Sequence, residues 1–226
     1  AENSAVLLKN TDNILPGNTN QNIAVIGKLA KEPVIQALGS SKVNPNTMDN
    51  SYDAFLDNNC KISYADGYSL ENEEIDECLL KEAIEISKNK DIVYLFVGNP
   101  KYTEAEGYDR KNINLPKLHE KLIYEIGKIN KNLVVVLQSG SVVKMDWSDV
   151  PKAILLTHLS GARGGNATVN ILLGKKNPSG KLNETYSNDL EDYPAMKFYP
   201  GDRNHLEYRE SIYVGYRYFD TAKKEV

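Results

Sequence analysis

The sequence predicts an α/β fold with helices on both faces of a mostly parallel sheet, followed by an extended C-terminal arm. Short runs rich in Val, Ile and Leu recur along the chain, and amphipathic segments separate them. Continuous apolar runs are typical of strands that are buried on both faces of a parallel sheet. Their alternation with helical patterns indicates a three-layer αβα sandwich with a doubly wound sheet.

Five runs are predicted as strands. Four of them are continuously apolar, and the fifth is weaker and is expected nearer an edge of the sheet. The four are residues 22–27, 92–98, 133–140 and 153–159, and the fifth is residues 61–67.

Three amphipathic segments between these runs are predicted as helices. Ser69 is a candidate N-cap for the first, whose apolar face extends to Ile86. Pro116 suits the first turn of the second helix. The third is expected over residues 165–173 and should end at Gly174.

The periodic pattern fades from about Leu182. Seven of the 14 tyrosines fall between Tyr186 and Tyr218. Tyrosine combines apolar area with a polar tip, which suits a segment that lies against another surface. The chain is therefore divided into a sandwich domain, residues 1–181, and an extended arm, residues 182–226. The arm is expected to pack on the sandwich or to reach toward a domain outside this chain.

The composition argues against several classes of partner. Hydrophobic residues make up 41% of the chain and charged residues 26%, which is ordinary for a globular protein. The net charge is −4 and the lysines are scattered, so no nucleic-acid partner is expected. Since no apolar run approaches the roughly 18 residues of a membrane span, no membrane partner is expected either. The first residues do not follow the pattern of a signal peptide, and the compartment stays open.

Common cofactor and nucleophile motifs are missing. The turn after the first predicted strand has neither G-x-G-x-x-G nor a Walker lysine, and no G-x-S-x-G elbow occurs. The three histidines are far apart, and the two cysteines lack metal-ligand spacing. We therefore predict no cofactor and no metal site.

The stretch YTEAEGYDR, residues 102–110, follows the predicted strand 92–98. Ligands of doubly wound sheets bind on loops beyond the carboxyl ends of the strands, so this position favours a function. Glu104 and Glu106 are two residues apart in the sequence, and we do not expect them to act as a catalytic pair. Asp109 and Arg110 are expected to form a local ion pair. On spacing alone, the stretch is interpreted as a solvated turn.

Seven segments in the same order along the chain resemble one known domain. They are SAVLLKNTDNILP (4–16), IAVIG (23–27), GSSKVNP (39–45), EAEGYDRKNINLP (104–116), VVVLQSGS (134–141), NPSGKLNETY (177–186) and SIYVGYRYFD (211–220). The domain is the second, α/β-sandwich domain of family 3 glycoside hydrolases, the β-glucosidase and β-xylosidase group. The family is described as retaining, with an aspartate nucleophile on a preceding (β/α)8 barrel and a glutamate acid/base on a sandwich loop.

The resemblance implies roles for individual residues. Glu106, directly before Gly-Tyr-Asp-Arg, would protonate the departing glycosidic oxygen and then deprotonate the incoming water. Ser40 would hydrogen-bond the sugar, although without the resemblance it fits a turn serine equally well. Gly107, Asp109 and Arg110 would support the loop.

The chain departs from the family because it holds no barrel. A barrel of about 250 residues does not fit beside a sandwich in this chain. A retaining mechanism needs two carboxyl groups about 5–5.5 Å apart, and this chain supplies one. The expected partners are a β-linked oligosaccharide or glycoside substrate and the barrel domain of the same enzyme, and the isolated chain is expected to be almost inactive. Two alternatives stay open: a non-catalytic carbohydrate- or protein-binding module, and a flavodoxin-like nucleotide binder, against which the missing phosphate loop counts.

Overall fold

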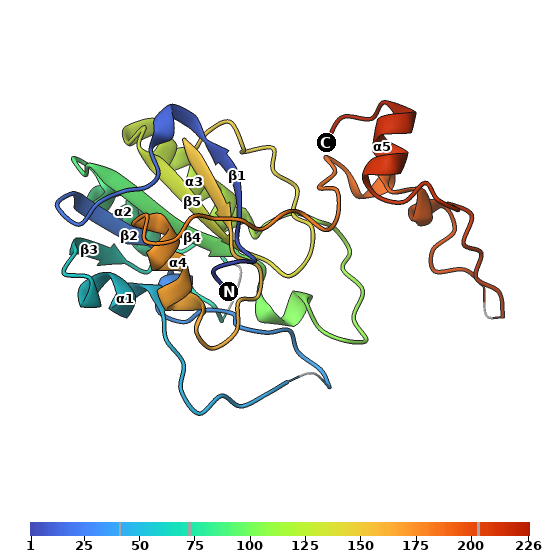
Figure 1. The fold of residues 1–226 in the computed structure, drawn as a ribbon, viewed down its shortest axis with the longest axis horizontal. Coiled ribbons are helices and arrows are strands. Elements are labelled where there is room, and N and C mark those ends of the chain that lie inside the picture. The colour runs from blue at the N-terminus through green and yellow to red at the C-terminus, as the bar shows by residue number, and fades with distance from the viewer. Residues whose placement is uncertain (41, 72–73, 203) are drawn as a thin grey trace.

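The computed structural model describes residues 1–40, 42–71, 74–202 and 204–226. It confirms the predicted fold class: one mixed sheet carries helices on both faces (Figure 1). The strands lie in the order β1-β6-β5-β4-β2-β3. Their bounds are β1 Val6–Asn10, β2 Asn22–Ile26, β3 Lys61–Ala65, β4 Ile92–Gly98, β5 Leu133–Gln138 and β6 Ala153–Leu156.

The five predicted runs all form strands, and they pair in parallel with one another. β3 lies at an edge, as its weaker pattern indicated. β1 was not predicted, and it pairs antiparallel with β6 at the other edge. Only Val6 of β1 is fully buried, so this strand lacks the continuous apolar run by which the central strands are recognised.

The helices pack as two pairs, α1 with α4 and α2 with α3, on opposite faces of the sheet (Figure 1). The chain runs from β2 outward to β3 through α1, and then returns past β2 to β4 through α2. Because crossovers between parallel strands are right-handed, these opposite directions place the helices on opposite faces. The α-helices are α1 Ser51–Asp57, α2 Glu77–Ser87, α3 Lys117–Ile129, α4 Gly164–Leu172 and α5 Tyr216–Ala222. Short 3-10 turns are η1 Thr11–Asn13, η2 Lys28–Ala30, η3 Lys101–Thr103, η4 Leu190–Asp192 and η5 Pro194–Lys197.

The predicted cap of α2 was wrong. Asp76 caps this helix, and its carboxylate accepts hydrogen bonds from the backbone N–H groups of Cys78 (2.8 Å) and Leu79 (3.1 Å). Ser69 instead accepts from the N–H of Glu71 in a local turn. Asp76 directly precedes the helix and satisfies the free N–H groups of its first turn. The helix therefore begins at Glu77 and does not extend back to Ser69.

The core is formed by both faces of β4 and β5, every residue of which is buried. On one face, the ring of Phe55 in α1 stacks on Tyr94 of β4, with centroids 5.2 Å apart. Trp147 is also fully buried and belongs to this core. Within the described ranges, no helix is long and apolar enough to cross a membrane.

The arm, residues 182–226, first lies on the sandwich and then projects from it (Figure 1). Tyr186 is buried, and Leu190 and Tyr193 pack against the core. Farther along, Phe219 of α5 packs edge-on against Tyr193, with ring centroids 5.6 Å apart. The projecting part therefore has its own small cluster of apolar contacts.

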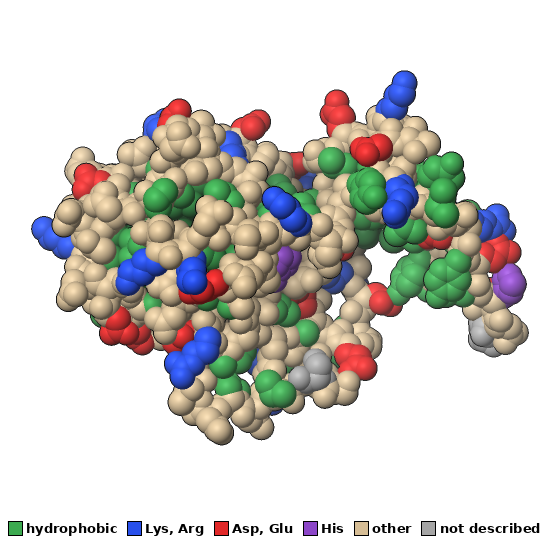
Figure 2. Space-filling model, in the orientation of Figure 1, with side chains coloured by type: hydrophobic (Ala, Val, Ile, Leu, Met, Phe, Trp, Pro, Cys, Tyr) green, Lys and Arg blue, Asp and Glu red, His purple; other side chains and the backbone are tan. Residues whose placement is uncertain are grey.

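Large apolar side chains are exposed on the projecting part of the arm (Figure 2). The exposed fractions are 84% for Tyr208, 67% for Ile212, 60% for Val214 and 61% for Tyr216. Apolar surface of this kind marks an interaction site more often than a free surface. That the arm contacts a domain outside this chain stays a prediction.

We expect the 226-residue chain to self-associate through this surface. The double variant Ile212→Ser/Tyr216→Ser should reduce association, because it removes apolar area from the arm. The matched control is Tyr124→Ser/Ile129→Ser, which changes the same residue types at exposed positions of α3. Sedimentation equilibrium measures the result. A chain that stays monomeric, or equal effects of the two double variants, would contradict the prediction.

Candidate active site

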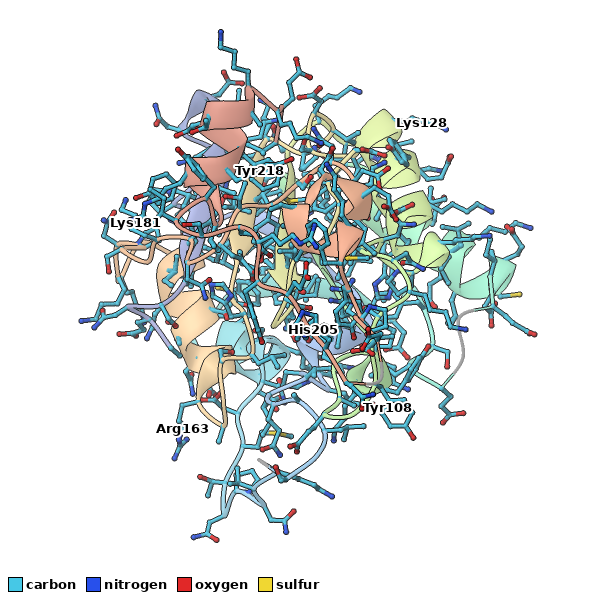
Figure 3. The ribbon with its side chains drawn as sticks, turned by 90° about the vertical axis from the view of Figure 1, so that its right-hand side faces the viewer. Tyr108, Lys128, Arg163, Lys181, His205 and Tyr218 are labelled. Atoms are coloured by element: carbon cyan, nitrogen blue, oxygen red, sulfur yellow. The ribbon has the colours of Figure 1, made fainter. Side chains whose placement is uncertain are left out.

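The candidate site lies where the parallel strands end. Residues 99–110, here called the acid loop, follow β4 directly. In Figure 3 the labelled Tyr108 of this loop and Arg163, which precedes α4, lie at the same end of the molecule, and Lys128 in the last turn of α3 lies at the opposite end. The position agrees with the rule that doubly wound sheets bind ligands beyond the carboxyl ends of their strands.

The acid loop is held against a second loop, residues 36–40, here called the serine loop. Leu38 and Ala105 form an isolated parallel β-bridge. The N–H of Leu38 donates to the carbonyl of Glu104, and the N–H of Glu106 donates to the carbonyl of Leu38, both at 3.2 Å. This bridge brings Ser40 beside Glu106.

The two residues that the sequence singled out separately are hydrogen-bonded to each other. Oε2 of Glu106 accepts from the backbone N–H of Ser40 at 2.8 Å and from its Oγ–H at 2.5 Å. Gly39 makes this approach possible: its φ is +112°, and an added Cβ would lie 2.6 Å from the Cβ of Glu106. Ser41, which shares the predicted GSS loop, lies outside the described residues.

The electrostatics of Glu106 follow from these bonds. Its side chain is exposed to solvent. The hydroxyl and then the N–H of Ser40 hold the pKa of Glu106 below its ordinary value, because both donors stabilise the carboxylate. In this state Glu106 is ionised at neutral pH.

Glu104 has the opposite orientation and a different environment. Its half-buried carboxylate ties the acid loop to the segment that follows β5. The donors to it are Asn99 Nδ2 (2.8 Å), Ser139 Oγ (3.2 Å), the N–H of Gly140 (3.0 Å), and the N–H (3.0 Å) and Oγ (2.7 Å) of Ser141. Its acceptor sites are occupied by the protein itself, so Glu104 supports the loop.

Arg110 reinforces the same connection. Its Nη1 donates to Ser141 Oγ at 2.8 Å and to the carbonyl of Val142 at 2.6 Å. The predicted ion pair with Asp109 was wrong, since the ion pairs of the described residues do not join them. A half-buried guanidinium must satisfy its donors nearby, and the turn after β5 supplies a carbonyl and a hydroxyl. Asp109 instead accepts a hydrogen bond from the Tyr199 hydroxyl, which links the acid loop to the arm.

Gly107 serves the turn that follows Glu106. Its φ is +82°, and a Cβ added there would meet no atom within 4 Å. The position therefore favours glycine for its backbone conformation, while space for a side chain is available.

A cleft of about 420 Å³ lies between the acid loop and the start of α3. Tyr102, Tyr108, Asp109 and Lys111 are among its lining residues, whereas Glu106 and Ser40 are not. Glu106 thus lies outside this cleft, with its side chain exposed to solvent.

The histidines are not brought together. Burial lowers the pKa of His119 to about 3, so this ring stays neutral between Tyr68 and Gly98. His158 is half-buried after β6. Among the residues that the structure describes, no group of three or more His, Cys, Asp and Glu side chains could hold a metal ion.

Sequence reasoning missed the residues that anchor the acid loop. Ser139 and Ser141 lie more than 30 positions after Glu104, in a segment to which the sequence analysis assigned no role at the site. Their place was nevertheless predictable in outline, because β4 and β5 are parallel and their carboxyl ends meet at one edge of the sheet.

The doubly wound sheet, with an exposed, hydrogen-bonded carboxylate at its carboxyl edge, belongs to the class of α/β folds that typically bind ligands at this edge. Its family follows from comparison with known proteins: a model described as the glycosyl hydrolase family 3 C-terminal domain matches residues 5–216. The chain belongs to this family.

Two relatives are similar along nearly the whole chain. Thermostable beta-glucosidase B of Acetivibrio thermocellus is 39% identical over 224 residues, which are 98% of this chain and 30% of that protein. An exo-alpha-(1->6)-L-arabinopyranosidase of Bifidobacterium breve is also 39% identical, over 99% of this chain and 31% of that protein. The crystal structure of a Bifidobacterium adolescentis GH3 beta-glucosidase has a TM-score of 0.94 and 41% identity, covering 100% of this chain and 33% of that one. The chain therefore spans about a third of the length of these proteins.

We expect Glu104→Gln to lower the free energy of unfolding by roughly 1–3 kcal/mol, because an amide N–H₂ would face the donors that the carboxylate now satisfies. Glu106→Gln is the matched control. It makes the same chemical change on an exposed side chain, where the effect should stay within about 0.5 kcal/mol. Urea denaturation of the chain measures both. Equal losses for the two variants would refute the anchoring role of Glu104.

Proposed function

We propose that this chain is the acid/base-bearing domain of a retaining β-glycosidase of the β-glucosidase type, with Glu106 as its acid/base. One observation carries the proposal: of the two glutamates in the acid loop, only Glu106 presents its carboxylate to solvent. Glu104 is occupied by donors from the end of β4 and the turn after β5. Membership of glycosyl hydrolase family 3 supplies the reaction class.

Glu106 acts in both halves of the reaction. As an acid, it gives its proton to the departing glycosidic oxygen while an aspartate of the barrel domain attacks the anomeric carbon. As a base, it then takes a proton from the water that displaces this aspartate. Its exposure and its mounting on a hydrogen-bonded loop suit a group that must reach a substrate on a neighbouring surface.

Ser40 is proposed to contact the sugar. Its hydroxyl donates to Glu106 here and, by rotation of the exposed side chain, could donate to a sugar oxygen instead. A serine loop bound to the acid loop would close over the substrate together with it, because the Leu38–Ala105 bridge joins the two.

The site is proposed to be completed by a barrel domain. The chain spans about a third of the length of its relatives, and the nucleophile would lie in the remainder. The isolated chain should therefore be almost inactive. Two relatives that are equally identical to this chain carry the names of a beta-glucosidase and an arabinopyranosidase. We propose that the choice of sugar depends on the rest of the enzyme.

In an enzyme that joins this chain to a family 3 barrel, Glu106→Gln should lower kcat/KM for an alkyl β-glucoside by about 10²–10⁴-fold. The loss should be smaller for a dinitrophenyl β-glucoside, since that leaving group departs without protonation. Azide should restore turnover of this substrate and yield the glycosyl azide, because an anionic nucleophile needs no general base.

The control is Glu85→Gln, an exposed glutamate on α2 that should leave turnover unchanged. Unchanged turnover of Glu106→Gln would remove Glu106 from the mechanism. Saturable binding of glycosides by the chain alone, with no effect of an added barrel, would favour a non-catalytic binding module instead.

A further inference from the structure

We propose that Ser40 is a positioning residue that controls the protonation of Glu106. Its hydroxyl holds Glu106 ionised in the free enzyme, and a sugar that engages this hydroxyl releases Glu106 to take up the proton it later donates. The inference deepens the proposed function and rests on the acid/base role of Glu106.

The geometry makes the Ser40 contact selective for the ionised form. Both donors of Ser40 converge on one oxygen, Oε2 of Glu106. A proton on Oε2 would face these two donors, and a proton on Oε1 would leave Oε2 a weaker acceptor. Hydrogen bonds to an ionised acceptor are roughly twice as strong as neutral ones, so the pair favours the carboxylate.

Only the hydroxyl half of this contact is free to change. The N–H of Ser40 is fixed beside Glu106, since the Leu38–Ala105 bridge and the close approach of Gly39 hold the two backbones together. The Oγ–H, in contrast, moves by rotation about one bond of an exposed side chain. The hydroxyl is also the first of the two causes that keep the pKa of Glu106 low.

Few charged side chains near Glu106 could influence its protonation besides Ser40's hydrogen bonds. In the acid loop, Glu104 is turned toward Gly140 and Ser141, and Asp109 is bonded to Tyr199. The serine loop from Gln36 to Ser40 carries no charged side chain, and the Gln36 amide is bonded to the backbone of Val43. Within the described residues, Glu106 forms no ion pair, so the Ser40 hydroxyl is its main local control.

The protons balance over a cycle. When the sugar takes the Ser40 hydroxyl, Glu106 gains one proton from solvent and then transfers it to the departing glycosidic oxygen as that bond breaks. In the second half, Glu106 takes a proton from the attacking water, whose oxygen bonds to the anomeric carbon. When the product leaves, this proton returns to solvent and the Ser40 hydroxyl bonds the carboxylate again.

The pH dependence of the joined enzyme tests the inference. The basic limb of kcat/KM reports the free enzyme, and that of kcat reports the substrate complex. The limb of kcat/KM should lie at lower pH than that of kcat in the wild type. In Ser40→Ala, the basic limb of kcat/KM should shift to higher pH, toward the basic limb of kcat. In Ser40→Thr, which keeps a hydroxyl, the difference in pH between the two limbs should remain.

A second readout does not depend on catalysis. In the 226-residue chain with ¹³C-labelled glutamate, the carboxyl resonance of Glu106, assigned by its loss in Glu106→Gln, should titrate at higher pH in Ser40→Ala than in wild type. An unmoved midpoint, or a Ser40→Ala variant that raises KM without shifting the kcat/KM limb, overturns the inference. A shifted midpoint together with full turnover of Glu106→Gln would instead overturn the proposed function and leave the pairing intact.

Discussion

The carboxylate of Glu104 is the interaction on which the candidate site depends. It accepts hydrogen bonds from the residue after β4 and from the turn after β5, and so fixes the acid loop to the carboxyl edge of the sheet. Arg110 binds the same turn from the other end of the loop. With the loop fixed at both places, the serine loop can form its parallel bridge to Ala105, and Ser40 reaches Glu106.

Two glutamates separated by one residue thus acquire different roles from their surroundings. Glu104 faces the protein, and its charge is stabilised by donors that are already in place. Glu106 faces solvent, with one oxygen bonded to Ser40 and the other directed to no partner among the described hydrogen bonds. Residues two apart in an extended strand lie on the same side, so the different directions of these side chains come from the irregular backbone of the loop, where Glu104 has φ −116° and ψ 66°. One residue holds the loop, and the other is available for a substrate.

The sequence predicted the central strands because their burial on both faces leaves continuous apolar runs. β1 was not predicted because only one of its five residues, Val6, is buried, so the strand lacks the apolar run of a central strand. Ser69 was misjudged because Asp76, which directly precedes the helix, caps it instead. The Asp109–Arg110 pair was misjudged because Arg110 binds Val142, a tertiary neighbour that local pattern does not reveal. The Ser40–Glu106 contact spans 66 positions, and no spacing rule reveals it. The family resemblance named both residues without indicating that they bind each other.

We propose that Glu106 forms one half of an active site whose other half is a carboxylate on a barrel. The most direct measurement is the distance between the Glu106 carboxyl and the nucleophilic aspartate, in a crystal structure of the joined enzyme with a bound glycoside analogue. We expect about 5–5.5 Å, the separation of a retaining pair, with the sugar between the two carboxyl groups. A separation beyond about 6.5 Å, or a different acid of this chain at the glycosidic oxygen, would contradict it.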